Sequence, residues 1–276
     1  MHDSLLHAGI PSPLPSSLRA RDVVEAILRE LPPLPSATCD RFQAGDPAWL
    51  VTGVAVTFMA TRAVLERAVA LGANLVITHE PTFYNHHDET EWIGDDPVYR
   101  SKASFLREHE LILWRCHDGP HLRRPDLIVE GMSRRFGWTL AAGEDFVCDI
   151  PPRSLRALAA TCRQILRCGP IRVAGELEML CRRVALLPGA WGGRKQIAFL
   201  RRDDVDVVLC GESPEWETCE YVRDAPAAER AKGLIVLGHA NSEEPGMERT
   251  VEWMRALLPA SLPVFHLPAG DPFRTV

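Results

Sequence analysis

Two apolar, β-branched runs, residues 49–58 and 74–78, are separated by a segment with a different period. In that segment, apolar residues recur at helical spacing from Val64 to Leu71, and Gly72 follows as a natural helix end. A strand, a helix and a second strand within about thirty residues are typical of a parallel βαβ unit, whose strands are buried on both faces. The pattern therefore predicts an α/β fold.

Strand and helix patterns continue to alternate along the rest of the chain. We expect two α/β lobes, residues 20–150 and 151–276, because each has its own series of strands and helices. Residues 1–19, rich in Pro and Ser, are predicted to form a flexible arm. Helices are predicted near residues 20–31, 61–71, 98–109, 126–136, 154–168, 214–230 and 245–258 and after residue 193, and further strands at residues 111–116, 182–189, 205–212, 233–239 and 263–267.

Composition and charge argue against several classes of protein. Of the 276 residues, 46% are hydrophobic and 25% charged, the balance of an ordinary globular protein. The net charge of −6 and the scattered Lys and Arg residues argue against nucleic acid as a partner. No apolar run reaches the roughly 18 residues of a membrane span, so we expect a cytoplasmic protein without membrane contact. The eight cysteines form no C-x-x-C pair, which favours buried, reduced thiols.

Polar side chains cluster where the predicted strands end. In open parallel sheets, ligands bind at the edge formed by the carboxyl ends of the strands. First-row divalent metals favour neutral imidazole and carboxylate ligands, and seven such groups exceed what one four-coordinate ion needs. We therefore predict two divalent ions, held close together by a bridging carboxylate. The seven candidate ligands are His79, Glu80, His117, Asp118, His121, His239 and Glu243.

Other polar residues near strand ends allow more than one interpretation. Glu212 is the candidate for a proton-transfer group, and a structural place near a helix N-terminus is the equal alternative. His86 and His87 are expected in a solvated loop, with an outer metal ligand or a substrate contact as the alternative. Gly192 and Gly193 could offer free N–H groups to a phosphate, although a lone Gly pair is a weak signal.

Two segments carry a resemblance to a known family: "GVAVTFMATRAVLERAVALGANLVITHEPTF" (residues 53–83) and "GHANSEEPGM" (residues 238–247). They resemble the signature pair of the Nif-three-like dinuclear-metal-centre family, often called type 2 GTP cyclohydrolase. The likeness extends from about residue 20 to residue 273. It implies two α/β lobes facing each other, two divalent ions (Zn, Mn or Fe) in the cleft, and assembly into a hexamer. It also implies that the segment from about residue 239 returns ligands to the cleft.

Position by position, His79 resembles the first residue of the family's His-His pair. His239 and Glu243 match its late His and Glu. The chain departs from the family at Glu80, where the family has the second His. The resemblance is therefore to a divergent branch with His-Glu-Pro in place of His-His-Pro.

A second departure lies in the family's His-x-x-x-Asp segment, which begins here at His117. His121 stands in place of the Asp, while Asp118 supplies a carboxylate three residues earlier. Together the two departures keep the total of nitrogen and oxygen ligands, so the predicted metal site remains. The bridging carboxylate is either Asp118 or Glu243.

Three classes of function fit these features. The first is a metal-dependent hydrolase that uses a metal-bound hydroxide on a small phosphorylated or nucleotide-like substrate. The second is a non-enzymatic metal-binding scaffold or metal-handling protein, and the third is a regulator that acts by protein contact. A catalytic metal site keeps an open coordination position, whereas a structural site is closed by protein ligands. Whether the predicted ligands leave a coordination position open therefore distinguishes a hydrolase from a non-enzymatic metal-binding protein.

Overall fold

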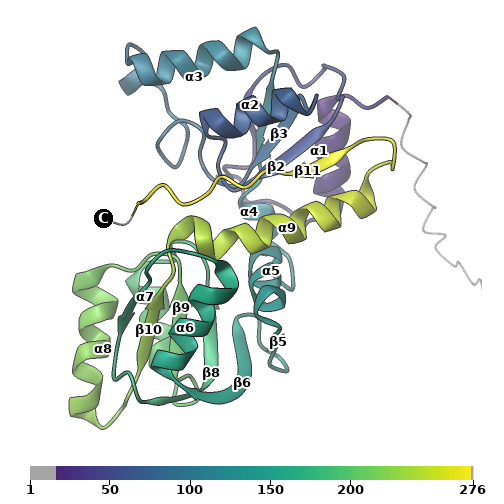
Figure 1. Cartoon of the computed structure of the whole chain (residues 1–276). Helices are drawn as coiled ribbons and strands as arrows, with labels where there is room; N and C mark the ends of the chain where they lie inside the picture. The colour runs from purple at the N-terminus through teal and green to yellow at the C-terminus, as the bar shows by residue number, and fades with distance from the viewer. Residues whose placement is uncertain (1–16, 275) are drawn as a thin grey trace, which may run out of the picture.

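The computed structural model describes residues 17–274 and residue 276, and it contains two mixed β-sheets with helices packed against them (Figure 1). The predicted α/β class is thereby confirmed. In the first sheet, β11, β2, β3 and β4 are parallel, and β1 pairs antiparallel with β4 at one edge. The strand order is β1 (Phe42–Ala44), β4 (Ile112–Arg115), β3 (Leu75–Thr78), β2 (Val54–Thr57) and β11 (Val264–His266).

The second sheet has three parallel strands at its centre and antiparallel strands outside them. A glycine follows within two residues of the end of each parallel strand, and the segments after β9 and β10 also carry Glu212 and His239. The strand order is β5 (Thr139–Leu140), β6 (Val147–Ser154), β8 (Leu180–Leu187), β9 (Val207–Cys210), β10 (Gly233–Val236) and β7 (Arg172–Ala174).

The central strands are buried on both faces because their alternate side chains enter different cores. In β2, Val54 and Val56 pack into one core of the first sheet, while Ala55 between them packs into the other. Helices supply the other half of each core. They are α1 (Ala20–Arg29), α2 (Arg62–Ala70), α3 (Pro97–Glu108), α4 (Asp118–Leu122), α5 (Leu127–Phe136), α6 (Leu155–Leu166), α7 (Gly193–Leu200), α8 (Glu220–Asp224) and α9 (His239–Leu257), with shorter helical turns at Glu91–Ile93, Glu215–Cys219 and Ala225–Ala228.

Helices α5 and α9 cross between the two sheets, as Figure 1 shows for α9. Two glycines allow the close approach: a Cβ atom at position 131 would lie 2.3 Å from the carbonyl oxygen of Pro245, and one at position 246 would lie 2.7 Å from Cα of Ile128. Ile128 packs into a core of the first sheet and Val129, the next residue, into a core of the second. The crossing therefore joins the hydrophobic cores of both sheets.

Three predicted elements differ from the observed ones. The first 49–58 strand is shorter, because Asn74 accepts a hydrogen bond from Thr52 N and donates one to Leu50 O, which holds these residues in a loop. The last helix begins at His239 instead of residue 245, since Gly238, with φ 91°, permits a sharp turn directly after β10. The predicted helix over 214–230 is present as a continuous helical segment over residues 215–228, but only its middle part, α8, is α-helical, between a π-helical and a 3-10 turn.

The two sheets do not divide the chain at a single point. The predicted boundary between residues 150 and 151 falls inside β6, and β11 returns to the first sheet, where it pairs with β2. Of the predicted arm over residues 1–19, residues 1–16 lie outside the described part. None of the helices within residues 17–274 has the length and apolar character needed to cross a membrane. All eight cysteines are free and six are buried, in agreement with their apolar surroundings.

Candidate metal centre

The carboxyl ends of parallel strands from both sheets border one cavity of about 720 Å³. Strands β3 and β4 of the first sheet lead into His79 and His117, and β10 of the second sheet leads into His239. Glu80, Asp118, His121 and Glu243 also lie at this edge, so the fold brings all seven predicted ligands into one region. Side chains from sequence positions far apart therefore meet, as expected for the ligand-binding edge of parallel sheets.

His79 is the most deeply buried of these side chains, with 1% of its surface exposed. Its backbone N–H donates to Thr57 O at 3.0 Å, which continues the ladder between β2 and β3 and fixes the direction of the side chain. The Nδ1 atom lies 3.2 Å from the carbonyl oxygen of Cys116. The Nε2 atom lies 3.4 Å from Oε2 of Glu243.

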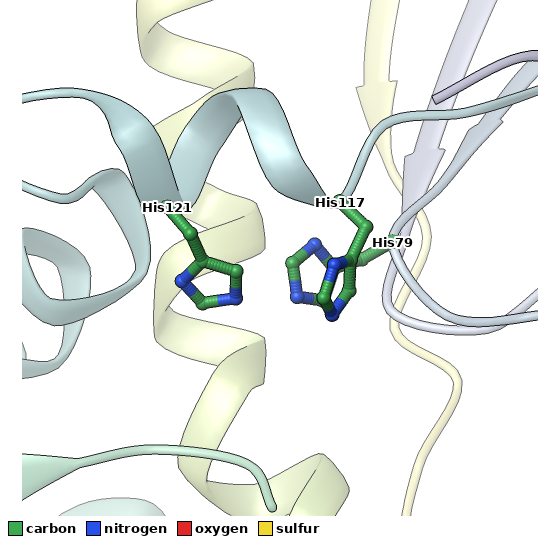
Figure 2. A group of neighbouring side chains, drawn as sticks. All are labelled: His79, His117 and His121. Carbon is green, nitrogen blue, oxygen red and sulfur yellow. The ribbon is translucent and has the colours of Figure 1, made fainter. Parts of the chain in front are cut away.

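His117, the N-cap residue of α4, and His121 within α4 lie one helical turn apart, close to His79 (Figure 2). The ring of His79 is 4.6 Å from that of His117 and 5.1 Å from that of His121, between ring centroids. Asp40 holds this short helix in place, because its carboxylate accepts the N–H groups of residues 117, 118 and 119 at 2.7–2.8 Å. The three imidazoles therefore form one compact group.

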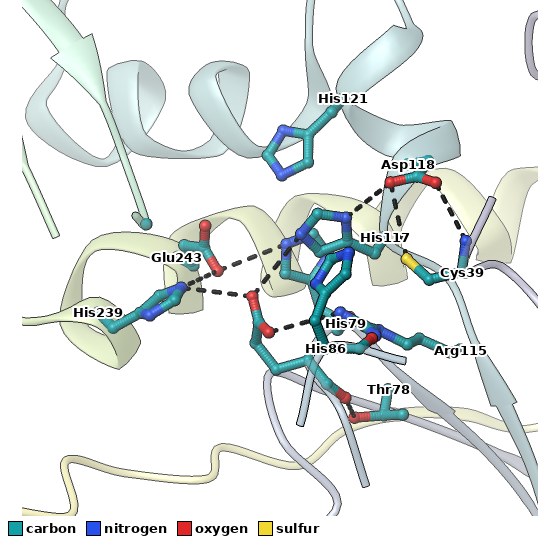
Figure 3. Close-up of polar contacts among 12 residues, drawn as sticks. Cys39, Thr78, His79, His86, Arg115, His117, Asp118, His121, His239 and Glu243 are labelled. Carbon is teal, nitrogen blue, oxygen red and sulfur yellow. Dashed lines mark hydrogen bonds and ion pairs between the residues drawn. The ribbon is translucent and has the colours of Figure 1, made fainter. Parts of the chain in front are cut away.

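His239 and Glu243 lie one turn apart at the start of α9, with Nε2 and Oε2 separated by 3.4 Å (Figure 3). Glu80 follows β3 of the first sheet, and its Oε1 lies 3.3 Å from Nε2 of His239 and 3.7 Å from Nε2 of His117. The carboxylates of Glu80 and Glu243 thus lie next to the Nε2 atoms of three histidines, His79, His117 and His239.

Each of the four histidines has its other ring nitrogen held by an oxygen. Because a carboxylate or a carbonyl oxygen only accepts a hydrogen bond, each Nδ1 carries a proton, and Nε2 is the nitrogen that offers a lone pair when the ring is neutral. This arrangement is typical of histidines that bind a metal. The Nδ1 partners are Cys116 O for His79 at 3.2 Å, Asp118 for His117 at 2.9 Å, Asp126 for His121 at 2.8 Å and Glu212 for His239 at 2.8 Å.

The charges in the cluster favour a bound cation. Burial and the neighbouring imidazoles His117 and His121 lower the pKa of His79 well below its usual range, so that this ring is neutral. At His239, burial acts in the same direction, but the nearby carboxylates of Glu243 and Glu80 outweigh it and raise the pKa to about 11. Two carboxylates this close to a histidine need a positive charge between them, which a proton or a metal ion can supply.

Buried nitrogen and oxygen atoms without a hydrogen-bond partner indicate that the clustered His and Glu side chains fit divalent metal ions. Within the described residues, the buried atoms Nε2 of His79 and Oε2 of Glu243 have no hydrogen-bond partner, although buried polar atoms are normally paired. A Cβ atom at Gly189 would lie 2.1 Å from Oε1 of Glu243, so the glycine makes room for this carboxylate. Ligand atoms of His79, His117 and His121, and those of His79, Glu80 and Glu243, lie within 4.8 Å of one another.

Arg115, a residue that the sequence analysis did not single out, supports Glu80 from the side opposite the histidines. It is fully buried, with Nη2 3.6 Å from Oε2 of Glu80 and Nη1 3.9 Å from Oδ2 of Asp88. Its guanidinium also donates to the carbonyl oxygens of His79 and His86. One oxygen of Glu80 therefore faces the buried guanidinium of Arg115, and the other faces the imidazoles. These contacts show how a carboxylate is accommodated at position 80 of this chain.

Two predicted residues take up different positions from the rest. The oxygens of Asp118 accept hydrogen bonds from Nδ1 of His117, Oγ1 of Thr38 and N of Cys39, at 2.8–3.2 Å, and the bond from His117 lowers the pKa of this carboxyl group. Glu212 reaches His239 but does not line the cavity. Both carboxylates therefore lie behind a histidine, on the side away from the Nε2 atoms.

Of the remaining candidates, one histidine lies at the cavity, and the other histidine and the glycine pair do not line it. His86 lines the cavity, with its ring 6.0 Å from that of His117, whereas His87 does not line it. A Cβ atom at Gly193 would lie 2.0 Å from Oε2 of Glu217, so a carboxylate already covers the N-terminus of α7 where a phosphate was considered.

Sequence reasoning also missed Asp126. Its carboxylate accepts hydrogen bonds from the backbone N–H groups of Ile128 and Val129 and from Nδ1 of His121. An Asp directly before an apolar helical pattern is a helix-capping signal, and this signal was available in the sequence. Its second contact, with a histidine five residues earlier, depends on the turn between α4 and α5. Local sequence patterns do not specify that turn.

The fold and the cluster define an α/β protein with a candidate metal centre built from histidines and carboxylates at the edges of two sheets. The chain belongs to the DUF34/NIF3 (NGG1p interacting factor 3) family, whose model matches residues 19–269. The predicted family is thereby confirmed.

Individual relatives are distant in sequence. The GTP cyclohydrolase 1 type 2 homolog of Clostridium perfringens is 21% identical over 244 residues, which cover 84% of this chain and 89% of that protein. A Bacillus cereus protein related to NIF3 is similar in structure, with a TM-score of 0.77, 14% identity and coverage of 94% and 99% of the two chains. A hypothetical protein of Staphylococcus aureus has a TM-score of 0.76, 16% identity and the same coverage. The structural similarity extends over nearly the whole chain.

Proposed function

We propose that the protein is a metal-dependent hydrolase that holds two divalent ions between two α/β lobes and acts on a small phosphorylated or nucleotide-like substrate. The observation that carries the proposal is the convergence of four imidazoles and two carboxylates, with every Nδ1 held by an oxygen. Two divalent ions there would supply Lewis acidity and activate a water molecule for attack. The name of the Clostridium perfringens relative, a GTP cyclohydrolase homolog, supports a nucleotide-like substrate.

Each residue has a proposed part in the site. Glu243 is the best candidate for the bridging carboxylate, because its Oε2 lies 3.4 Å from Nε2 of both His79 and His239. Asp118 and Glu212 are better placed to orient His117 and His239 through Nδ1 than to contact an ion. A metal-ligand role for Asp118 and proton transfer by Glu212 stay predictions from the sequence.

The cavity favours a hydrolase over a closed structural metal site. Glu80, His117, His121, His239 and Glu243 all line a space of about 720 Å³, large enough for a nucleotide-sized molecule. Metal ions held by these side chains would face that space, whereas structural sites are surrounded by protein ligands. A screen of metal-loaded protein against phosphomonoesters, phosphodiesters, nucleotides and cyclic amides tests the proposal. Turnover of none of them in the presence of Mn, Zn or Fe would argue for a role in metal binding alone.

Purified protein is expected to carry close to two divalent ions per chain, because more nitrogen and oxygen ligands converge than one ion can use. Inductively coupled plasma mass spectrometry after gel filtration measures the ratio. Chelation should remove both the ions and the hydrolytic activity, and added metal should restore the two together. A chain that binds no ion after supplementation would contradict the proposed site.

The protein is also expected to assemble into a hexamer, as the family resemblance implies. Multi-angle light scattering should report a mass close to six times the chain mass of 30.7 kDa. The measurement is made at micromolar concentration, with and without chelator, so that a metal requirement for assembly is detected. A stable monomer would contradict this part of the proposal.

A further inference from the structure

Two aromatic rings, those of Trp191 and Phe146, also line the cavity. Trp191 lies in the loop between β8 and α7, and Phe146 lies directly before β6, so both come from the second sheet. The ring centroid of Trp191 is 5.6 Å from that of the candidate ligand His121 and 5.5 Å from that of Phe146. A partly exposed aromatic surface therefore begins at the candidate metal centre and continues away from it.

Lys195, on the first turn of α7, adds a positive charge to this surface. Its Nζ lies 5.3 Å from the ring centroids of both Trp191 and Phe146. Arg124 is the other cation that lines the cavity, and its Nε is paired with Asp145 at 2.9 Å. Lys195 has no carboxylate within 4.0 Å among residues 17–274. Of the Lys and Arg side chains that line the cavity, Lys195 is therefore the one without a carboxylate partner among the described residues.

An aromatic face next to an unpaired ammonium group is suited to a ligand that has both a planar ring and an anionic group. Planar rings stack on Trp, and an ammonium group forms charge-assisted hydrogen bonds with phosphate oxygens. Because Trp191 contacts both His121 and Lys195, the ring of a ligand would lie between the metal centre and the ammonium group.

We propose that Trp191, Phe146 and Lys195 form a binding subsite for a planar aromatic ring that carries a phosphate group, with Lys195 contacting the phosphate and Trp191 the ring. The subsite rests on the proposed function, since it defines the substrate class of the same cavity.

Isothermal titration calorimetry of the full-length protein as purified tests the subsite, with adenosine 5′-monophosphate, adenosine, phenyl phosphate and inorganic phosphate as probes. The wild type should bind the nucleotide about tenfold more tightly than adenosine, because the charged contact adds to the ring contact. Lys195→Met should remove this preference, and Lys195→Arg should keep most of it. Trp191→Ala should weaken the nucleotide and adenosine by about tenfold each and leave inorganic phosphate unchanged.

Arg194→Met is the matched control, because Arg194 is an exposed cation next to Lys195 that does not line the cavity. Its affinities should equal those of the wild type. The subsite is refuted if Lys195→Met keeps the preference for the nucleotide, or if neither aromatic phosphate binds the wild type more tightly than inorganic phosphate does.

Product release from the same compounds, and from their diester forms, separates the two proposals. Binding that depends on Lys195 without any hydrolysis would refute the proposed reaction and support the subsite. Hydrolysis accompanied by binding that does not depend on Lys195 would support the reaction and refute the subsite.

Discussion

Glu243→Gln is expected to release at least one of the two metal ions and to lower metal-dependent hydrolysis by more than ~100-fold, since even residues that only orient a ligand change affinity or activity by ~10–100-fold. The amide has the shape of the carboxylate but lacks its charge. Oε2 of Glu243 lies between His79 and His239, so no other carboxylate oxygen takes over this contact at both rings. Metal content and turnover are measured on the same preparation.

Glu252→Gln is the control for this substitution, because Glu252 lies on the same helix with 62% of its side chain exposed and away from the cavity. It should keep both ions and full activity. The thermal midpoint of Glu243→Gln with excess metal shows whether the helix still folds. A folded Glu243→Gln protein with two ions per chain would mean that Glu243 is not a ligand.

Asp126→Asn is expected to weaken metal binding by ~10–100-fold while the helix cap is preserved. Oδ1 of Asp126 accepts the N–H groups of Ile128 and Val129, and an Asn oxygen can do the same. The amide nitrogen would then face Nδ1 of His121 and donate to it. This bond moves the proton of His121 to Nε2 and removes the lone pair that a metal needs.

Asp96→Asn is a closely matched control, because Asp96 caps α3 with the same two contacts, to the N–H groups of Val98 and Tyr99 at 2.8 and 3.2 Å. Among the residues that the structure describes, no histidine is bonded to Asp96. Both variants should melt within a few degrees of the wild type, and only Asp126→Asn should lose metal affinity in a competition titration with a chromophoric chelator. Equal metal affinities in the two variants would show that His121 is not a metal ligand whose tautomer is fixed by Asp126.

The general position of the site could be predicted from the sequence, because apolar runs buried on both faces end directly in polar residues. His79 and Glu80 follow such a run, and so does His117. Parallel pairing of β2, β3 and β4 then brings these ends together, and the structure has this pairing. Position along the chain was sufficient here, since each of these strands has only four residues and leads directly to its polar end.

The roles of individual carboxylates could not be predicted in the same way. Asp118 and Glu243 are both acidic residues near a strand end, yet one faces Nδ1 of a histidine and the other faces Nε2 atoms. That difference depends on the orientation of each imidazole, which is set by packing and by partners such as Asp40. Trp191 and Lys195 were also missed, because only the approach of the second sheet places them beside His121.

The crossing of α9 over α5 has a consequence for how the protein is made. Met247 and Val251 of α9, and Val264 of β11, belong to the same core as Val24 and Ile27 near the start of the chain. The first sheet therefore lacks part of its interior until the last residues have been synthesised, and contacts this distant in sequence form slowly. Because Glu243 lies on that same helix, the proposed metal site would be completed in the step that completes the core. A chain that holds the metal ions of the proposed site would then also be a fully folded one.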